Sequence, residues 1–461
     1  MLSRTALSRG AQLAARRQGS AQLRSYAAAA AASSSIPTSF AYETATFAGV
    51  RVASRDSHGP TTKLAVVAKA GTRYEPAPGL AAGLEEFAFK TTESRSALLI
   101  TREAELLGGQ LTAYHTREAL VLEASFLRED IPYFTELLAE VISWTKYTTF
   151  EFHEEVEGVL HLKQAKLAGD VSALALDAAH AVAFHNGLGA SLYPLPSTPL
   201  KGYLNENAIA DYAGAVYQKS NIALVADGAT TKSLERWTEQ FFKRIPASAP
   251  SGVALESKAS TYYGGEQRTS HTGGNALVIA FPGSSFGTFK PEIAVLTALL
   301  GGQPNVKWSP GFSLLAKAAA ASPGVTVSAT NLAYSDAGLL AIQINGTAAS
   351  VRKTAEEAVK ALKRIAAGST SKEDLTKAVA KAKFEALDAS QSGVSTLVSA
   401  GSGIVQTGKP FQIAETVQSI DSVTADKLQA AAKALLDGKA TVAAIGDLHV
   451  LPFAEELGLK V

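Results

Sequence analysis

Several features are missing from this 461-residue chain, and each absence excludes a class of chemistry. There is no cysteine, which excludes disulfide frameworks, thiol nucleophiles, iron–sulfur clusters and cysteine-ligated zinc. The formal net charge is only +1, so nothing indicates a nucleic-acid surface or a polyanionic substrate. No apolar run approaches the roughly 18 residues that a membrane-spanning helix needs. We therefore expect no nucleic-acid partner and no transmembrane segment, so any membrane association would depend on partners or on the surface.

The N-terminal segment, residues 1–40, contains no acidic residue; its basic residues are Arg4, Arg9, Arg16, Arg17 and Arg24. Many serines and alanines accompany them, which is the composition of a mitochondrial transit peptide drawn inward by the membrane potential. A secretory signal would need an uninterrupted apolar stretch, which the arginines break. Residues 24–27 resemble the site cut by the matrix processing peptidase, with the cut between Tyr26 and Ala27. A disordered basic tail is the alternative.

Two strand patterns occur twice along the chain. Residues 63–71 form a β-branched strand pattern that ends at a glycine, and residues 275–283 repeat that plan. Later in each half a helical pattern leads into a strand and an acidic residue, at residues 221–227 and again at 440–447. The two copies are separated by similar distances in both cases, so we predict two homologous domains.

Helical periodicity accompanies the strands in both halves. Apolar residues recur on one helical face over 133–144 and 351–365, a capping pattern at 371–374 begins another helix, and residues 424–436 form a further one. Strands and helices occur in clusters and not in strict alternation, which favours an α+β fold. We expect a transit peptide and flexible lead over 1–40, domains over 41–245 and 271–461, and a linker over 246–270.

Two glycine-containing motifs must be weighed before a function is assigned. Residues 283–287 match the G-x-S-x-G pattern of serine hydrolases, which requires the serine on a sharp strand-to-helix turn. The next helix is expected to begin only near Pro291, so an ordinary strand–turn–helix connection is favoured. Residues 403–409 match the G-x-x-x-x-G-K part of a P-loop, but Pro410 stands where the motif has serine or threonine. No strand pattern precedes them, so phosphate binding is not expected.

The eight histidines are the remaining route to metal chemistry. Neither His153 with His161 nor His180 with His185 has the i,i+4 spacing that places two imidazoles on one helix face. We interpret each histidine as a surface residue or a hydrogen-bonded core residue. The four that stand alone in the sequence are His58, His115, His271 and His449.

The most specific segment of the chain is Gly79–Thr92, which reads GLAAGLEEFAFKTT. It resembles the G-x-A-H-F-L-E-H-M-x-F-K-G-T signature of pitrilysin-type zinc peptidases. In that family two histidines of an H-x-x-E-H helix bind zinc, the glutamate between them takes the proton of the zinc-bound water, and a distant glutamate completes the site. The resemblance implies two homologous peptidase-like α/β-sandwich domains.

Carried over position by position, the resemblance implies a degenerate metal site. The first histidine position is Ala82 and the second is Glu86, whereas the base position is retained as Glu85. The third ligand position falls on Lys163, and the match of residues 179–184 to another family motif supports this register. Alanine offers no lone pair and an ammonium group repels a cation. We therefore expect no catalytic residue, no metal and no zinc hydrolysis by this chain alone.

Two kinds of non-catalytic relative share these features. The substrate-binding subunit of the mitochondrial processing peptidase carries a glycine-rich loop; here the corresponding stretch keeps the flanking Gly301, Gly302 and Gly311 but no glycine run. The core protein 2 family of mitochondrial ubiquinol–cytochrome c reductase (complex III) resembles the chain in residues 312–318 and 327–340. We favour the second resemblance, which covers the chain after residue 40. A non-catalytic presequence-binding subunit is the alternative.

The core 2 resemblance implies a bowl-shaped, dimer-forming structural subunit that supports assembly and stability of a respiratory-chain complex. Its partners would be a core 1-type subunit, cytochrome b, cytochrome c1 and the iron–sulfur subunit, on the matrix side of the mitochondrial inner membrane and peripheral to it. Electron transport would pass through those subunits. The chain would hold no cofactor, in agreement with its lack of cysteine ligands. A peptidase half-site completed by a partner, or a presequence receptor, are the rival functions.

Overall fold

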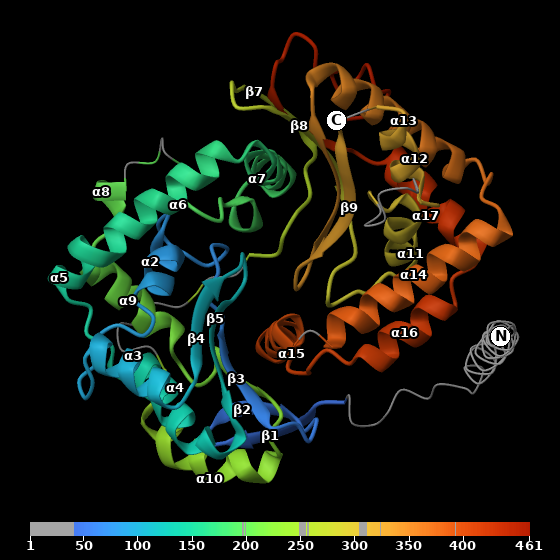
Figure 1. Cartoon of the computed structure of the whole chain (residues 1–461). Coiled ribbons are helices and arrows are strands. Elements are labelled where there is room, and N and C mark those ends of the chain that lie inside the picture. Colours follow the sequence, from blue (N-terminus) through green and yellow to red (C-terminus); the bar gives the residue numbers. More distant parts are fainter. Residues whose placement is uncertain are drawn as a thin grey trace, which may run out of the picture. The chain divides into compact units, whose positions relative to one another are not determined.

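The computed structural model describes residues 41–461 except 196–197, 199, 249–254, 256–257, 304–310, 323 and 392. The predicted transit peptide and its cleavage site, Tyr26 and Ala27, lie outside the described residues. Residues 41–461 cluster into one unit. Within that unit, two sheets are each covered by helices on both faces (Figure 1).

The first half of the chain is built on a six-stranded mixed sheet with the order β1-β2-β6-β3-β5-β4. Strands β2 and β6 are parallel, and the other neighbours are antiparallel. The central strand β3 is rich in valine and alanine and lies almost entirely inside the protein. The bounds are β1 Glu43–Phe47, β2 Val50–Arg55, β3 Thr61–Ala68, β4 Gln110–His115, β5 Leu120–Leu127 and β6 Ile222–Asp227.

The second half is built on a five-stranded sheet with the order β7-β11-β8-β10-β9. Here β7 and β11 are parallel and the other neighbours are antiparallel. Apart from β1, the two sheets have the same order of strands and the same directions, so the repeat expected from the sequence is present in the topology. The bounds are β7 Gly265–Ser270, β8 Asn275–Pro282, β9 Thr326–Ala333, β10 Gly338–Gly346 and β11 Thr441–Gly446.

The repeated strand patterns are confirmed as β3, β6, β8 and β11, and the α+β class is confirmed. Strand β7 was not predicted, and it lies inside the segment expected to be the linker, 246–270. Its six residues are polar or glycine, and half of them are exposed because β7 is an edge strand of the sheet. Without apolar alternation, the sequence carries no strand signal there. The domain boundaries remain a prediction.

The helices predicted over 133–144, 351–365, from 371, and over 424–436 are confirmed as α4, α13, α14 and α17. The first half contains α2 Leu80–Glu86, α3 Ala97–Leu106, α4 Ile131–Trp144, α5 Thr149–Glu151, α6 Glu157–Gly169, α7 Val171–Phe184, α8 Leu200–Tyr203, α9 Glu206–Val216 and α10 Thr231–Phe241. The second half contains α11 Pro291–Leu300, α12 Leu314–Ala320, α13 Ala348–Ala366, α14 Lys372–Gln391, α15 Gly393–Thr407, α16 Ile413–Asp421 and α17 Ala425–Asp437. Three short 3₁₀ helices are η3 Arg128–Asp130, η5 Gly187–Gly189 and η6 Phe242–Arg244, and η4 Phe152–Val156 is a π-helix.

One helix of each half covers the sheet of the other half. Helix α7 of the first half packs on β8, β10 and β11, and α15 of the second half packs on β2, β3 and β6 (Figure 1). The opposite face of each sheet packs on helices of its own half. Both sheets are therefore buried on both faces, which explains why their central strands read as continuous apolar runs. The buried helix residues that pack on the other half are Val171, Ala175, Ala179, Ala183, Phe184, Leu397, Ala400 and Ile404.

Helix α15 approaches the first sheet closely at Gly401. A Cβ atom at this position would lie 2.4 Å from Cγ2 of Val67, a distance that side chains do not tolerate. The glycine therefore sets how near the exchanged helix can come to the sheet, although glycine in a helix interior is unfavourable by itself.

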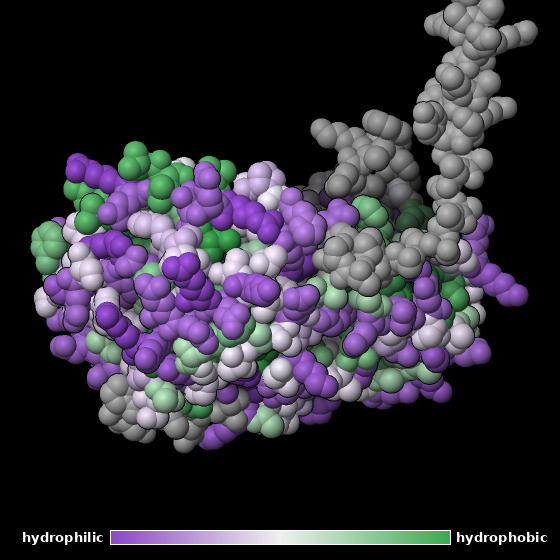
Figure 2. Space-filling view, turned by 90° about the horizontal axis from the view of Figure 1, so that it is seen from below, coloured by the Kyte–Doolittle hydropathy of each residue, from purple (hydrophilic) through white to green (hydrophobic). Residues whose placement is uncertain are grey.

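Among the described residues, no single helix is long and apolar enough to cross a membrane. Residues 149–169 and 171–184 are together long and apolar enough, but the two helical segments are bent by 93° relative to each other. The face of the protein shown in Figure 2 is mostly hydrophilic, with smaller hydrophobic patches between the hydrophilic residues.

Candidate functional site

Helix α2 carries three of the four positions of the predicted degenerate metal site. Gly79, with a φ of 94°, forms the turn into the helix, where an L-residue with a side chain would be strained. Ala82, Glu85 and Glu86 then share one helical face because they are spaced i, i+3 and i+4. Ala82 is buried in the apolar core of the first half and presents only a methyl group.

Helix α6 brings Lys163, the fourth position, to the carboxylates of α2. Its Nζ lies 2.5 Å from Oε1 of Glu85 and also forms an ion pair with Glu86. The side chain of Glu85 is 6% exposed and that of Lys163 is 26% exposed, so the ion pairs are largely shielded from water. The ammonium group therefore supplies a positive charge beside the two carboxylates, at the third ligand position.

His115, at the end of β4, is part of the same cluster although sequence reasoning did not connect it to the site. Its Nδ1 contacts Oε2 of Glu85, its backbone N–H donates to the same oxygen at 3.2 Å, and its Nε2 lies 2.7 Å from the carbonyl oxygen of Leu192. Both ring nitrogens face oxygen acceptors. A proton must therefore lie in the contact with Glu85, on one partner or the other.

Tyr193 closes the cluster. The ring of His115 meets the Tyr193 ring edge to face, with a centroid distance of 5.0 Å, and the Lys163 ammonium lies 5.3 Å from the Tyr193 centroid. An aromatic face in this position adds a favourable cation–π contact to the two ion pairs of the lysine.

The electrostatics of the cluster favour the charged forms of Glu85 and Lys163. Burial alone would raise the pKa of Glu85, but hydrogen bonds and charges of His115 and Lys163 outweigh it and hold that pKa below its ordinary value. Burial would lower the pKa of Lys163, but Glu85 and Glu86 raise it above its ordinary value. At neutral pH the lysine is charged and cannot act as a base.

This arrangement does not fit a catalytic zinc ion. Position 82 has no donor atom, and the ammonium group that is bonded to both Glu85 and Glu86 would repel a metal cation. In the part of the chain that the structure describes, no group of three or more histidine, aspartate or glutamate side chains could hold a metal ion. A proton-transfer role for Glu85 is also disfavoured, because its carboxylate is already engaged by two partners.

A pocket adjoins the cluster between α6 and α7, with a cavity volume of about 310 Å³. Lys163 and Tyr193 are shared between the cluster and the pocket wall, and Leu167, Leu176 and Leu192 provide apolar lining. The charged residues Arg117 and Asp177 at this wall are bonded to each other at 2.5 Å. Lys166 and Asp170 also line the wall, so the pocket combines apolar area with charged side chains.

The positions expected from the glycine-rich loop lie in the second half. Gly301 follows α11 with a φ of 62°, Gly302 forms a β-bridge with Ser328, and Gly311 has a φ of 73°. Residues 304–310 between them lie outside the described residues. The structure does not bring these glycines to the α2–α6 cluster.

The motifs that sequence analysis set aside have structural roles. The hydroxyl groups of Ser284 and Ser285 accept hydrogen bonds from the backbone N–H groups of Lys290 and Thr288, and α11 begins at Pro291 as expected. The near-P-loop segment begins inside helix α15, without a preceding strand.

His180 is a hydrogen-bonded core residue, as predicted. Its Nδ1 donates to the carbonyl oxygen of Leu176 at 2.7 Å, and its Nε2 accepts from the hydroxyl of Tyr334 at 2.7 Å. Burial, followed by the nearby charge of Arg117, lowers the pKa of His180 to about 3. The imidazole is therefore neutral in the folded protein and links α7 to the second half.

Comparison with known proteins agrees with this geometry. Residues 51–194 match the family described as "Insulinase (Peptidase family M16)", and residues 203–382 match "Peptidase M16 inactive domain". A Neurospora crassa protein named "Cytochrome b-c1 complex subunit 2, mitochondrial" is 64% identical over 100% of both chains. Proteins of the same name from Yarrowia lipolytica and Homo sapiens are 37% and 28% identical, covering 90% and 89% of this chain and 96% and 90% of their own.

Proposed function

Because this chain belongs to peptidase family M16 and to the mitochondrial cytochrome b-c1 complex subunit 2 proteins within it, we propose that it is a structural core subunit of complex III. In this role it supports assembly and stability of the respiratory complex and performs no catalysis of its own. The observation that carries the non-catalytic part is the pairing of Lys163 with Glu85 and Glu86. A fixed internal cation and a bound zinc ion would compete for the same carboxylates.

The finer assignment concerns partners and place. We propose that the chain pairs with a core 1-type subunit and contacts cytochrome b, cytochrome c1 and the iron–sulfur subunit in a dimeric complex. Its place would be peripheral, on the matrix side of the mitochondrial inner membrane. The basic, acid-free segment over residues 1–40 and the mitochondrial names of the relatives support this proposal. The absence of cysteine agrees with electron transfer through other subunits.

The decisive experiment is purification of the C-terminally tagged chain from mild-detergent extracts of mitochondria. We expect a large complex that contains b- and c-type haem, seen in the reduced-minus-oxidised spectrum. A haem-free heterodimer that cleaves presequence peptides would refute the proposal and favour a processing-peptidase subunit. An untagged strain, extracted in parallel, controls for haem proteins that adhere to the resin.

A second experiment separates a structural role from a catalytic one. Mitochondria that carry Glu85→Gln in place of the original residue should retain complex III electron transfer per assembled complex, because no step of the reaction uses this carboxylate. The amount of assembled complex is measured separately by haem content. Loss of turnover in complexes with normal haem content would contradict a purely structural subunit.

A further inference from the structure

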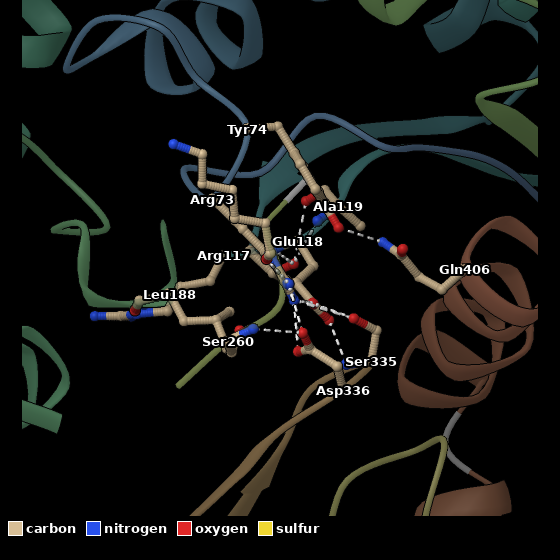
Figure 3. A network of polar contacts seen from close by, with 12 residues as sticks. Arg73, Tyr74, Arg117, Glu118, Ala119, Leu188, Ser260, Ser335, Asp336 and Gln406 are labelled. Carbon is tan, nitrogen blue, oxygen red and sulfur yellow. Dashed lines mark hydrogen bonds and ion pairs between the residues drawn. The ribbon is translucent and has the colours of Figure 1, made fainter. Parts of the chain in front are cut away.

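The two halves of the described unit are joined by a buried polar network as well as by the exchanged helices (Figure 3). Three turns meet there: the segment after β3, the turn between β4 and β5, and the turn between β9 and β10. We call the side chains of Arg73, Glu118, Ser335 and Asp336 the junction network.

Arg73 lies at the centre of the junction network. Its Nη1 donates to Oε1 of Glu118 at 2.6 Å, in the first half. The same guanidinium makes two parallel hydrogen bonds to Asp336 of the second half, from Nη1 to Oδ1 at 2.8 Å and from Nη2 to Oδ2 at 2.7 Å. Both bonds of such a bidentate pair form only when the planar guanidinium and carboxylate groups have one relative orientation. The pair therefore fixes this orientation as well as stabilising the contact.

Glu118 reaches across in the opposite direction. Its Oε2 accepts from the backbone N–H of Ser335 at 2.8 Å, and its Oε1 accepts from the hydroxyl of Ser335 at 2.6 Å. Each half therefore places one carboxylate that is bonded by the other half. Because the bonds run both ways, a change in the angle between the halves would break several of them together.

The segment that connects the two halves is also bonded to the junction network. The backbone N–H of Ser260 donates to Oδ2 of Asp336 at 2.8 Å, and Nη2 of Arg73 donates to the carbonyl oxygen of Lys258 at 2.9 Å. The connecting chain is thus held at the point where a hinge would otherwise act.

The junction network lies in a shielded environment. The side chains of Arg73 and Glu118 are 4% and 7% exposed, whereas that of Asp336 is 33% exposed. Burial would raise the pKa of Asp336, but its bonds with Arg73 and Ser260 hold that pKa below its ordinary value. Loss of the guanidinium would leave two carboxylates close together without their shared counter-charge, which is unfavourable in a buried site.

The apolar contacts between the halves lack this directional character. Helix α7 meets the second sheet through the small side chains of Ala175, Ala179 and Ala183 and through the larger Val171 and Phe184 at its two ends. Small apolar side chains resist separation from each other, but they offer little resistance to sliding, because hydrophobic attraction is non-directional. Directional bonds are needed to select one orientation; besides the junction network, they include His180 with Tyr334 and Gln412 with Tyr42.

We propose that the junction network is a conformational lock that holds the two halves at one fixed angle, with Arg73 as its central residue. The exchanged helices keep the halves together, and the junction network determines how they are oriented. This inference does not depend on the proposed function, since it concerns the isolated chain.

The lock can be tested with paired spin labels, because the chain has no cysteine of its own. The between-half pair is Glu239→Cys on α10 with Lys433→Cys on α17, and the within-half pair is Glu239→Cys with Arg102→Cys on α3; all three original side chains are exposed. Pulsed electron–electron double resonance then gives the distribution of distances between the two spin labels of each pair. In the parent chain we expect a narrow distribution for both pairs.

Arg73→Met should at least double the width of the between-half distribution and leave the within-half distribution unchanged. Asp336→Asn, which keeps the shape but removes the ion pair, should widen it less. Arg128→Met is the matched control, because Arg128 forms a bidentate pair with Asp56 inside the first half, at 2.9 and 2.6 Å. This control should leave the between-half distribution unchanged.

Two results would overturn the inference. An unchanged between-half distribution in both Arg73→Met and Asp336→Asn would mean that the other contacts between the halves set the angle. Widening of the within-half pair by the same factor would mean that the junction network holds the fold of the first half and not its orientation. If Arg73→Met does not fold, Asp336→Asn alone decides the question.

Discussion

The two halves follow one plan up to the helix that comes after the central strand, and there they differ. After β3, helix α2 buries the carboxylate of Glu85 and places Glu86 beside it. After β8, the corresponding helix α11 buries only apolar side chains, among them Ile293, Leu296 and Leu300. The same backbone position therefore serves packing in one half, whereas in the other it carries charge that must be neutralised.

The difference teaches what a degenerate site requires in order to remain stable. A buried carboxylate without a partner is costly, so a helix that buries a glutamate needs a cation beside it. Lys163 supplies it from α6, the helix that packs on α2. In the second half, α14 packs on α11 in the same way, but there is no buried carboxylate for it to neutralise.

The largest effect should come from removing this cation. We expect Lys163→Met to lower the free energy of unfolding by about 3 kcal/mol, because two shielded carboxylates lose their shared partner. Lys381→Met on α14 is the matched change in the second half, where the lysine forms an ion pair with the half-exposed Glu385 at 3.5 Å. It should cost less than about 1 kcal/mol. Urea denaturation measures both, and equal losses would remove the contrast between the halves.

The next effect concerns the exchanged helices. Gly401→Ala should destabilise the protein by about 2 kcal/mol, because the new methyl group would overlap Val67 at 2.4 Å. Gly158→Ala on α6 is the control, since its added Cβ meets nothing within 4 Å. There the better helix propensity of alanine should raise stability by about 1 kcal/mol. Thermal unfolding of both variants tests whether their stabilities change in opposite directions, and a loss of stability in both would contradict this prediction.

A smaller effect is expected from acid, through His180 on α7. Its folded pKa of about 3 lies below the unfolded value, so protons bind the unfolded chain more readily as the pH falls below about 6.5. Its contribution to stability is present above that pH and is lost progressively toward pH 3. Between pH 7 and pH 5.5 we expect a loss of about 1 kcal/mol that His180→Gln no longer shows. An identical pH dependence in the variant would contradict this assignment.

The smallest effect should be that of metal. Neither zinc nor a chelator should move the melting temperature of the purified chain by more than about 1 °C, because binding to the folded state is what produces such a shift. The triple variant Ala82→His, Glu86→His and Lys163→Glu restores donor atoms at all three ligand positions and serves as the positive control. A zinc-dependent shift in the unmodified chain would contradict the degenerate-site prediction.

Much of this protein could be predicted from local patterns. The repeated strands, the amphipathic helices and the α+β class follow from side-chain periodicity, because each pattern has a single compatible backbone. The degenerate metal site is a prediction from the family resemblance, which places Ala82, Glu86 and Lys163 at the ligand positions, where their residue types lack the expected donor atoms. These conclusions needed no knowledge of distant contacts.

Other features have no local signal. His115 joins Glu85 only because β4 ends beside α2, and the polar strand β7 pairs only because β11 offers it an edge. Arg73 and Asp336 lie far apart in the chain and meet through the arrangement of three turns.

By itself, the sequence determined the fold class and the repeat, since both depend on residue type and short-range spacing, and its family resemblance predicted a metal site without its zinc ligands. Only the tertiary structure decided which charges neutralise one another, which helix covers which sheet and what links the two halves. Those outcomes depend on distances between residues that are remote in sequence, and such distances are set by packing of the whole unit.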